Sequence, residues 1–357
     1  MASFDLRSAY HQVPVNEQYT KYLGFAIELA DGRKKYYKYR MLPFGLNDAA
    51  RVLTKLMRSP LERWRSMGIK CFIHLDDGFK FTSSKEATLE ASKVVRDDLM
   101  RYGLLISESK CSWGARRVLE WTGFVFDTVS FKLWVPQDKL ERAVSKVEGL
   151  IRASRALVAV RDLASVAGLI GSLRLAMGEV VRFNTRAMMM RVAEVTDTQG
   201  WGVKVMLGDR VTEELAFWRD NLSRLNGHLM RKEDRVLSVT SIEMYSDASA
   251  YLLGGAQFRG ETEVQGTRYQ ACLSEEEVVR SSTYRELRAI EEGLRVRGSE
   301  LEGHVVRWGC DNWAASQIVR LGSMKLDCHQ VAQRINGLVQ KYSLQLEPFW
   351  LCTDTGL

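Results

Sequence analysis

Six acidic residues have the type and spacing for metal-dependent chemistry, and they fall into two groups of three. The groups are Asp5, Asp76 and Asp77, and Asp247, Glu286 and Asp311. Magnesium prefers hard oxygen ligands and keeps room for water and substrate phosphates. Two such ions about 4 Å apart can activate a hydroxyl or a water and stabilise a leaving group in phosphoryl transfer. Each group is therefore a candidate two-metal site, provided that the fold brings its carboxylates together.

The residues of the first group lie in apolar segments whose pattern predicts β-strands. Asp5 lies between Phe4 and Leu6, so in a strand its carboxylate points away from the core. The apolar run before Asp76 delivers two adjacent carboxylates into a tight turn. A second interpretation stays open, because Asp-Gly between hydrophobic runs is a strong hairpin signal that needs no metal. An acid at a strand end, such as Asp5, is also commonly solvated.

The second group spans two expected strands and one helix. Asp247 lies on a strand, Glu286 opens a helix, and Asp311 ends a later strand. Three carboxylates placed in this way could bind two ions and hydrolyse a phosphodiester with activated water. Each residue also has a structural alternative: Thr283-x-x-Glu286 is a capping box, Asp311 suits a helix cap, and Asp247 suits a turn.

The elements that would position these residues follow from hydrophobic periodicity. In the N-terminal part we predict strands at 3–6, 22–29, 35–39, 71–75 and 123–126, and helices at 49–67 and 85–102. From Pro136 to about residue 226 the pattern is helical, with a capped helix start at Thr212. The C-terminal part predicts strands at 236–246, 254–258 and 304–309, and helices at 284–296 and 314–319. Three domains are expected, at 1–135, 136–235 and 236–357.

Composition limits the class of protein. Hydrophobic residues make up 46% of the 357 residues, which allows ordinary globular cores. The net charge of +7 fits a polyanionic partner. The chain has neither an apolar run long enough to span a bilayer nor a secretory signal, so we expect an intracellular protein, cytoplasmic or nuclear, with no membrane partner. The six cysteines form no CxxC pair, which argues against a zinc ribbon or a disulfide framework and favours buried reduced thiols.

Five blocks occur in a defined order. They are FDLRSAYHQVP from Phe4, MLPFGLNDAA from Met41, LDD from Leu75, GLLI from Gly103 with a following Lys-Cys, and WTGF from Trp121. Together they resemble the palm of reverse transcriptases over residues 1 to about 127. The FDL-x-x-AY and LPFGL blocks look most like those of retrotransposons of the tyrosine-recombinase (DIRS-type) group.

This resemblance implies roles for individual residues. Asp5 and Asp76 match the two principal metal ligands, Asp77 matches the second acid of the turn, and the cofactor would be Mg²⁺ or Mn²⁺, two ions per active site. The substrate-binding positions that match are Tyr10, which would exclude a ribose 2′-hydroxyl, Pro43, Phe44 and Gly45 of the nucleotide and template loop, Lys110 near the triphosphate, and Trp121 and Gly123 of the primer-grip hairpin. His74 stands where the family usually has tyrosine. Ala50 and Leu53 depart from the usual proline and phenylalanine.

The second acidic group, which follows a helical connector, resembles the ribonuclease H domain of retroelements over about 240–357. That likeness implies metal ligation by Asp247, Glu286 and Asp311. The chain is expected to be truncated at both ends: the fingers region has no counterpart before Asp5, and the fourth acid of that domain is not reached. Asp354 is not assigned to that role.

The combined expectation is an α+β protein with a palm sheet and helices, a helical thumb or connection, and a ribonuclease H-like α/β domain. It implies an RNA-directed DNA polymerase with an attached ribonuclease H-like domain. The implied partners are an RNA template, a DNA primer, RNA–DNA hybrid, dNTPs and other polyprotein domains. Two alternatives remain: a non-catalytic nucleic-acid-binding remnant of a decayed or domesticated element, and an RNA-copying enzyme that makes RNA, which Tyr10 disfavours.

Overall fold

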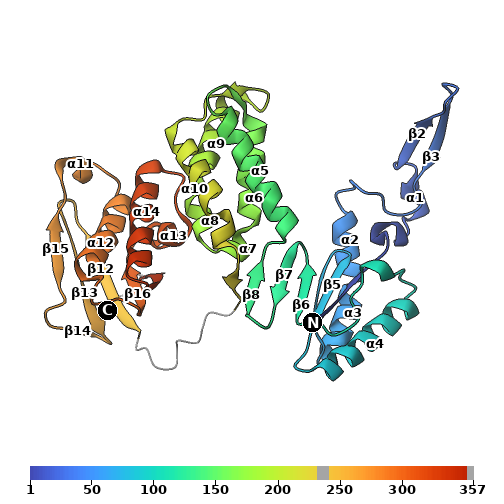
Figure 1. The fold of residues 1–357 in the computed structure, drawn as a ribbon, viewed down its shortest axis with the longest axis horizontal. Helices are drawn as coiled ribbons and strands as arrows, with labels where there is room; N and C mark the ends of the chain where they lie inside the picture. The colour runs from blue at the N-terminus through green and yellow to red at the C-terminus, as the bar shows by residue number, and fades with distance from the viewer. Residues whose placement is uncertain (231–240, 352–357) are drawn as a thin grey trace. The chain divides into compact units, whose positions relative to one another are not determined.

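The computed structural model describes residues 1–230 and 241–351, and it separates into two compact units. Unit 1 is Met1–Pro136 and unit 2 is Gln137–Leu357 (Figure 1). Each unit is described by itself. The helical segment and the second large sheet both belong to unit 2.

Unit 1 is built around a three-stranded antiparallel sheet. Its strand order is β1 (Ala2–Asp5), β5 (Asp77–Phe81) and β4 (Lys70–His74). Helix α3 (Arg58–Ser66) packs on β4, and α4 (Lys85–Arg101) contacts α3. The core on this side includes the fully buried Trp64 and Leu99. A Cβ atom at Gly78 would lie 2.1 Å from the ring of Phe4, so this cross-strand contact requires glycine.

The helix predicted at 49–67 is two helices, α2 (Ala49–Leu56) and α3. The single-helix prediction was wrong because it ignored Pro60, which has no N–H to donate to the Leu56 carbonyl. Met57 lies at the junction, where its N–H bonds to the Leu53 carbonyl. The other unit 1 helix predicted from periodicity, at 85–102, is confirmed within one residue as α4.

Smaller elements surround this three-stranded sheet, which we call the palm sheet after the resemblance described above. They are the 3₁₀ helices η1 (Ala9–Gln12) and η2 (Glu108–Lys110), helix α1 (Glu17–Thr20), the hairpin β2 (Gly24–Glu28) and β3 (Lys34–Lys38), and the antiparallel set β6 (Val118–Trp121), β7 (Phe124–Asp127) and β8 (Lys132–Trp134). Figure 1 shows the β2–β3 hairpin extending away from the palm sheet within unit 1. Every residue of both hairpin strands is exposed.

The N-terminal part of unit 2 is helical. Its elements are α5 (Gln137–Ala153), β9 (Val158–Ala159), α6 (Val160–Ser172), α7 (Arg174–Met177), α8 (Val180–Phe183), α9 (Arg186–Gln199), β10 (Lys204–Val205), α10 (Asp209–Leu225) and β11 (His228–Leu229). Helix α10 packs on α5 and α9 and buries Leu215 and Trp218 completely. The predicted start of this helix at Thr212 was wrong. The cap is Gly208 at φ 77°, and the Thr212 hydroxyl donates to the Asp209 carbonyl inside the first turn.

The C-terminal part of unit 2 is a six-stranded mixed sheet. The order is β14 (Thr262–Glu263), β13 (Leu252–Arg259), β12 (Ile242–Ala248), β16 (Val305–Cys310) and β17 (Gln345–Trp350), with β15 (Tyr269–Cys272) also paired to β13. The pairs β12–β16 and β16–β17 are parallel, and the others are antiparallel. Residues 236–240 of the strand predicted at 236–246 lie outside the described residues.

Four helices accompany this sheet. They are α11 (Glu275–Val278), α12 (Ser282–Arg297), α13 (Trp313–Leu321) and α14 (Leu326–Lys341). Helix α12 covers β12 and β13 and contacts α14 along its length (Figure 1). Their shared core contains Leu287, Ile290, Val306 and Trp308, all fully buried.

Two expectations from composition can be compared with the described residues. No helix in 1–230 or 241–351 has the length and apolar character to span a bilayer. The five cysteines in these ranges are free thiols, but they are not uniformly buried, since Cys272 is exposed and Cys111 is half-buried.

Candidate functional sites

The strand register of the palm brings the first acidic group together. Asp5 ends β1 and is the direct cross-strand partner of Asp77, the first residue of β5. Asp76 lies in the turn before it, and its carbonyl accepts a hydrogen bond from the Leu6 N–H at 3.0 Å. Leu75 has a positive φ of 58°, which makes the turn tight. The two parts of this group, 71 residues apart in sequence, therefore meet at one end of one sheet.

Electrostatics in this group are dominated by like charges. Burial raises the pKa of the Asp77 carboxyl above its ordinary value, and the neighbouring Asp76 and Asp5 carboxylates raise it further. The Lys110 ammonium opposes this effect and lies 3.5 Å from Asp5 Oδ2. Asp5 itself is buried at 8% exposure. The three neighbouring carboxylates, only partly offset by the Lys110 ammonium, favour the binding of further positive charge.

A cavity of about 280 Å³ opens beside these carboxylates. The residues that line it include Asp5, Asp76, Tyr10, Phe44 and Lys110. The Tyr10 ring meets the Phe44 ring edge-on, with their centroids 5.3 Å apart. Five predicted residues from four separate sequence blocks thus share one cavity. Pro43 and Gly45 flank Phe44 in its loop, where Gly45 has φ 86°.

Three other predicted residues lie outside the cavity lining. His74 ends β4 opposite Asp77 and is exposed. Trp121 ends β6, and its ring stacks on Phe79 of the palm sheet with centroids 5.1 Å apart. Gly123 has φ 74° in the turn to β7, a conformation that favours glycine. Trp121 therefore contacts the three-stranded sheet, and neither Trp121 nor Gly123 lines the cavity.

Sequence reasoning missed two residues at this site. Arg7 lines the cavity. The Cys111 thiol accepts a hydrogen bond from the Asp5 N–H at 3.3 Å and donates to the Ser107 carbonyl at 3.2 Å. No sequence signal indicates a role for Cys111 at this site, apart from its position directly after Lys110. Its contact with Asp5 depends on a pairing across more than 100 residues.

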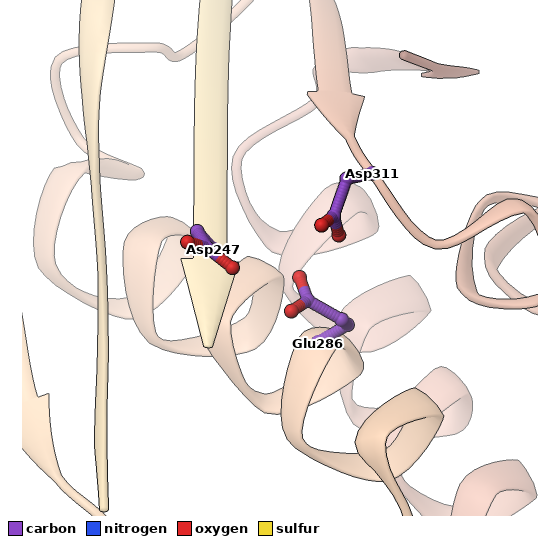
Figure 2. A group of neighbouring side chains, drawn as sticks. All are labelled: Asp247, Glu286 and Asp311. Atoms are coloured by element: carbon purple, nitrogen blue, oxygen red, sulfur yellow. The ribbon is translucent and has the colours of Figure 1, made fainter. Parts of the chain in front are cut away.

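The second acidic group converges more tightly than the first. One oxygen each from Asp247, Glu286 and Asp311 lie within 4.8 Å of one another, and Figure 2 shows the three side chains pointing toward a common point. Within the described ranges this is the one group of three potential ligands that meets that distance; the palm aspartates do not. Strands β12 and β16 are parallel, with Tyr245 opposite Gly309. Asp247 and Asp311, each two residues further along, therefore lie side by side at the carboxyl ends of these strands.

The structural alternatives for this group are not what the structure adopts. Ser281, not Thr283, caps α12 by accepting from the Tyr284 N–H, so the capping-box interpretation of Glu286 was wrong. Asn312, not Asp311, caps α13 through the Ala315 N–H. Each cap lies one or two residues from the predicted one and frees the acid for other contacts.

The Glu286 side chain has one carboxylate oxygen that is hydrogen-bonded and one that is not. Its Oε1 accepts from the Ala248 N–H at 2.9 Å, whereas its buried Oε2 has no hydrogen-bond partner among the described residues. Burial raises the Glu286 pKa to about 8, and the charges of Asp311 and Asp247 add to that rise. A buried carboxylate oxygen without a partner is costly. A divalent cation bound by this group would satisfy it.

Comparison with known proteins identifies the N-terminal region. Residues 1–126 match the family described as reverse transcriptase (RNA-dependent DNA polymerase). This region is therefore a reverse transcriptase region. The chain is also 28% identical over 123 residues to the "Enzymatic polyprotein" of Cestrum yellow leaf curling virus, a stretch that covers 34% of this chain and 18% of that polyprotein.

Solved structures resemble the whole chain in fold. A foamy viral protease-reverse transcriptase in complex with double-stranded DNA matches 99% of this chain with a TM-score of 0.53 and 14% identity. The foamy viral protease-reverse transcriptase in complex with RNA/DNA hybrid matches with a TM-score of 0.52 and 12% identity. This chain covers 57% and 44% of those two chains. At these identities the likeness supports an α+β, reverse-transcriptase-like fold.

Proposed function

We propose that this chain is an RNA-directed DNA polymerase that extends a DNA primer on an RNA template with dNTPs. The observation that carries the proposal is the register that sets Asp5 against Asp77, beside a cavity shared with Tyr10 and Lys110. The family match over residues 1–126 supports the same activity. The two-metal site is itself part of the proposal.

The residues present fit a pair of Mg²⁺ or Mn²⁺ ions. Asp5 and Asp76 offer hard oxygens at the cavity, and like-charge repulsion around Asp77 would be relieved by added positive charge. When bound, the ions would activate the primer hydroxyl and stabilise the pyrophosphate that leaves. Lys110 would hold the triphosphate by charge, and Tyr10 would close the space that a ribose 2′-hydroxyl needs.

A conservative substitution tests this assignment. Asp76→Asn keeps the shape of the turn but removes one metal-binding charge, so we expect magnesium-dependent primer extension to fall to background. Extension of a labelled DNA primer on an RNA template measures it. Asp97→Asn, an exposed carboxylate on α4, is the matched control and should keep wild-type activity. Undiminished extension by Asp76→Asn would sink the proposal.

A second activity is supported by the group around Glu286. We propose that Asp247, Glu286 and Asp311 bind two divalent ions and hydrolyse the RNA strand of RNA–DNA hybrids. The partnerless Glu286 Oε2 and the convergence of three carboxylates support it. Domain boundaries near 136 and 235, with a ribonuclease H-like domain after them, are part of the same proposal.

Glu286→Gln should abolish cleavage of a labelled RNA–DNA hybrid, because the neutral amide cannot replace a carboxylate ligand for a hard cation. Glu276→Gln, at an exposed position on α11, is the matched control. Isothermal titration with Mn²⁺ should also show that Glu286→Gln loses the binding due to this group and keeps the binding due to Asp5 and Asp76. Retained cleavage in that variant would contradict the assignment.

We also propose an origin in a retrotransposon of the DIRS-type group, which rests on the FDL-x-x-AY and LPFGL blocks alone.

The primer-extension and hybrid-cleavage experiments also distinguish the non-catalytic alternative. A chain that binds primer–template but extends no primer, in wild-type form and with saturating Mn²⁺, would be a binding remnant. Incorporation of ribonucleotides at the same rate as deoxynucleotides would instead favour an enzyme that makes RNA.

A further inference from the structure

Six ring side chains form a continuous series that begins at the palm cavity. The series, which we call the aromatic strip, is Tyr10, Phe44, His11, Tyr39, Phe25 and Tyr37. Each ring contacts the next, with centroid separations between 4.8 and 6.2 Å. Tyr10 and Phe44 line the cavity, whereas Phe25 and Tyr37 are cross-strand partners in the β2–β3 hairpin. The strip therefore connects the candidate polymerase site to the hairpin.

The strip is open to solvent over most of its length. Phe44 is 70% exposed, and Phe25, Tyr37 and Tyr39 are each more than a third exposed. Soluble proteins rarely leave a connected apolar surface of this kind without a binding partner. Phe25 and Tyr37 lie on the hairpin strands and are not part of the large core of unit 1, whereas Tyr10 at the other end of the strip packs against that core.

Charge indicates the chemistry of the partner. Between residues 19 and 40 the cations are Lys21, Arg33, Lys34, Lys35, Lys38 and Arg40, and the anions are Glu28 and Asp31. One of these cations, Arg33, pairs with Asp31 at 2.7 Å. Exposed rings bordered by excess positive charge combine base stacking with attraction to phosphates, as in surfaces that bind single-stranded nucleic acid without sequence preference.

We propose that the aromatic strip binds unpaired nucleotides of the template strand by stacking, as they approach the Asp5–Asp76 cavity. This inference rests on the proposed polymerase function, because it places the strand relative to that cavity. A continuous duplex would offer few free base faces to such rings, so the strip should prefer single strands. Binding should be tolerant of sequence, since every base has a stacking face.

The hairpin supplies its own matched control. Tyr36 is 80% exposed and pairs with Ala26, one residue along from the Phe25–Tyr37 pair. Neighbouring residues of a strand point to opposite faces, so Tyr36 lies on the face away from the strip. Tyr36 has the same side chain as Tyr37, lies in the same stretch of charge and is the more exposed of the two, at 80% against 45%. Tyr36 occupies the opposite face of the hairpin.

The test is fluorescence anisotropy with labelled oligouridylate as the single strand, in EDTA and in the Asp76→Asn background. Phe25→Leu and Tyr37→Leu keep apolar bulk but remove the ring, and we expect binding to weaken roughly 5- to 100-fold for each. Tyr37→Trp should restore it, and Tyr36→Leu should leave it unchanged. Circular dichroism and size-exclusion chromatography check the fold and oligomeric state of each variant.

The outcomes separate this proposal from its rivals. Equal losses for Tyr36→Leu and Tyr37→Leu, or no loss for either strip variant, would overturn it. Unchanged binding together with a variant-dependent change from dimer to monomer would assign the face to a second copy of the chain and would also overturn it. Because metal is absent from the binding assay, failure of primer extension would count against the polymerase proposal and not against the strip.

Discussion

At the scale of single residues, Lys80 is the position that the sequence pattern least explains. It lies on β5, three residues after Asp77, and is completely buried. Its ammonium faces the rings of Trp113 and Phe4, 4.6 and 5.6 Å from their centroids. Its Nζ has no hydrogen-bond partner among the described residues. Burial lowers the Lys80 pKa to about 8, because removal of water penalises the charged form.

This lowered pKa makes a stability prediction with a defined sign. Between about pH 8 and the ordinary lysine pKa the unfolded chain binds more protons than the folded chain, so stability rises with pH there. Below pH 8 the full cost of the buried charge is present. Lys80→Met should therefore stabilise unit 1 at pH 7 by about 1–3 kcal/mol, with the ring contacts offsetting part of the gain.

Urea unfolding of Lys80→Met at pH 7 and at pH 9.5 measures the effect. The advantage of the variant should shrink at the higher pH. Lys70→Met is the control, since Lys70 is exposed on β4 of the same sheet and also faces a ring, that of Phe81. A destabilised Lys80→Met variant would show that the buried ammonium has a favourable partner.

At the scale of elements, one buried histidine joins α14 to the end of α8. His329 Nε2 lies 3.1 Å from the Phe183 carbonyl, and its Nδ1 accepts from the Ser323 N–H. The ring stacks on Phe183. Close by, the Arg186 guanidinium donates to the Leu321 carbonyl. These contacts connect the helical part of unit 2 to the helices that accompany its sheet.

His329 should make the stability of unit 2 dependent on pH. Burial lowers its pKa to about 4, so the folded chain holds the ring neutral while the unfolded chain protonates it near pH 6.5. The contribution is present above pH 6.5 and is lost as the pH falls toward 4. His329→Gln cannot titrate, so its stability relative to the wild type should improve by roughly 1–3 kcal/mol between pH 7 and pH 4.5.

Chemical denaturation followed by near-ultraviolet circular dichroism at several pH values measures this difference. Carboxylates will add their own acid dependence to both proteins, so the informative quantity is the difference between variant and wild type. His304→Gln, in a turn before β16, is the control and should follow the wild type. An unchanged difference across this range would mean that the ring is hydrated or already charged in the folded chain.

At the scale of the whole molecule, the division into two compact units predicts separable behaviour. Unit 1 holds the palm group and unit 2 holds the group around Glu286. Each unit has its own buried core, so two unfolding transitions are expected instead of one. In differential scanning calorimetry, Lys80→Met should move one transition and His329→Gln the other. A single transition that both variants shift would show that the units unfold as one.

Much of the palm could be predicted because its signals are local. Alternating apolar residues on each side of Asp5 and before Asp76 define strands. The hairpin between β4 and β5 is present, but its two turn residues are Leu75 and Asp76, whereas the Asp77-Gly78 pair begins β5. The same locality explains the errors. One interior proline divided a helix, and the caps of α10 and α12 lie four and two residues before the predicted ones. Cap choice depends on where the chain enters the helix and not on composition alone.

The sequence by itself determined which acids belong to each candidate site and which strands or helices carry them. The tertiary structure decided which of these side chains meet, because the contacts between them join residues distant in sequence. Parallel pairing of β12 with β16 brought Asp247 and Asp311 to the same end of the sheet, close to Glu286. Within 1–230 and 241–351, Glu286 Oε2 has no hydrogen-bond partner. Antiparallel register set Asp5 against Asp77. The aromatic strip likewise exists only after folding, since hairpin pairing and a loop contact place its rings in series. No local pattern encodes such pairings, because each depends on where another strand ends.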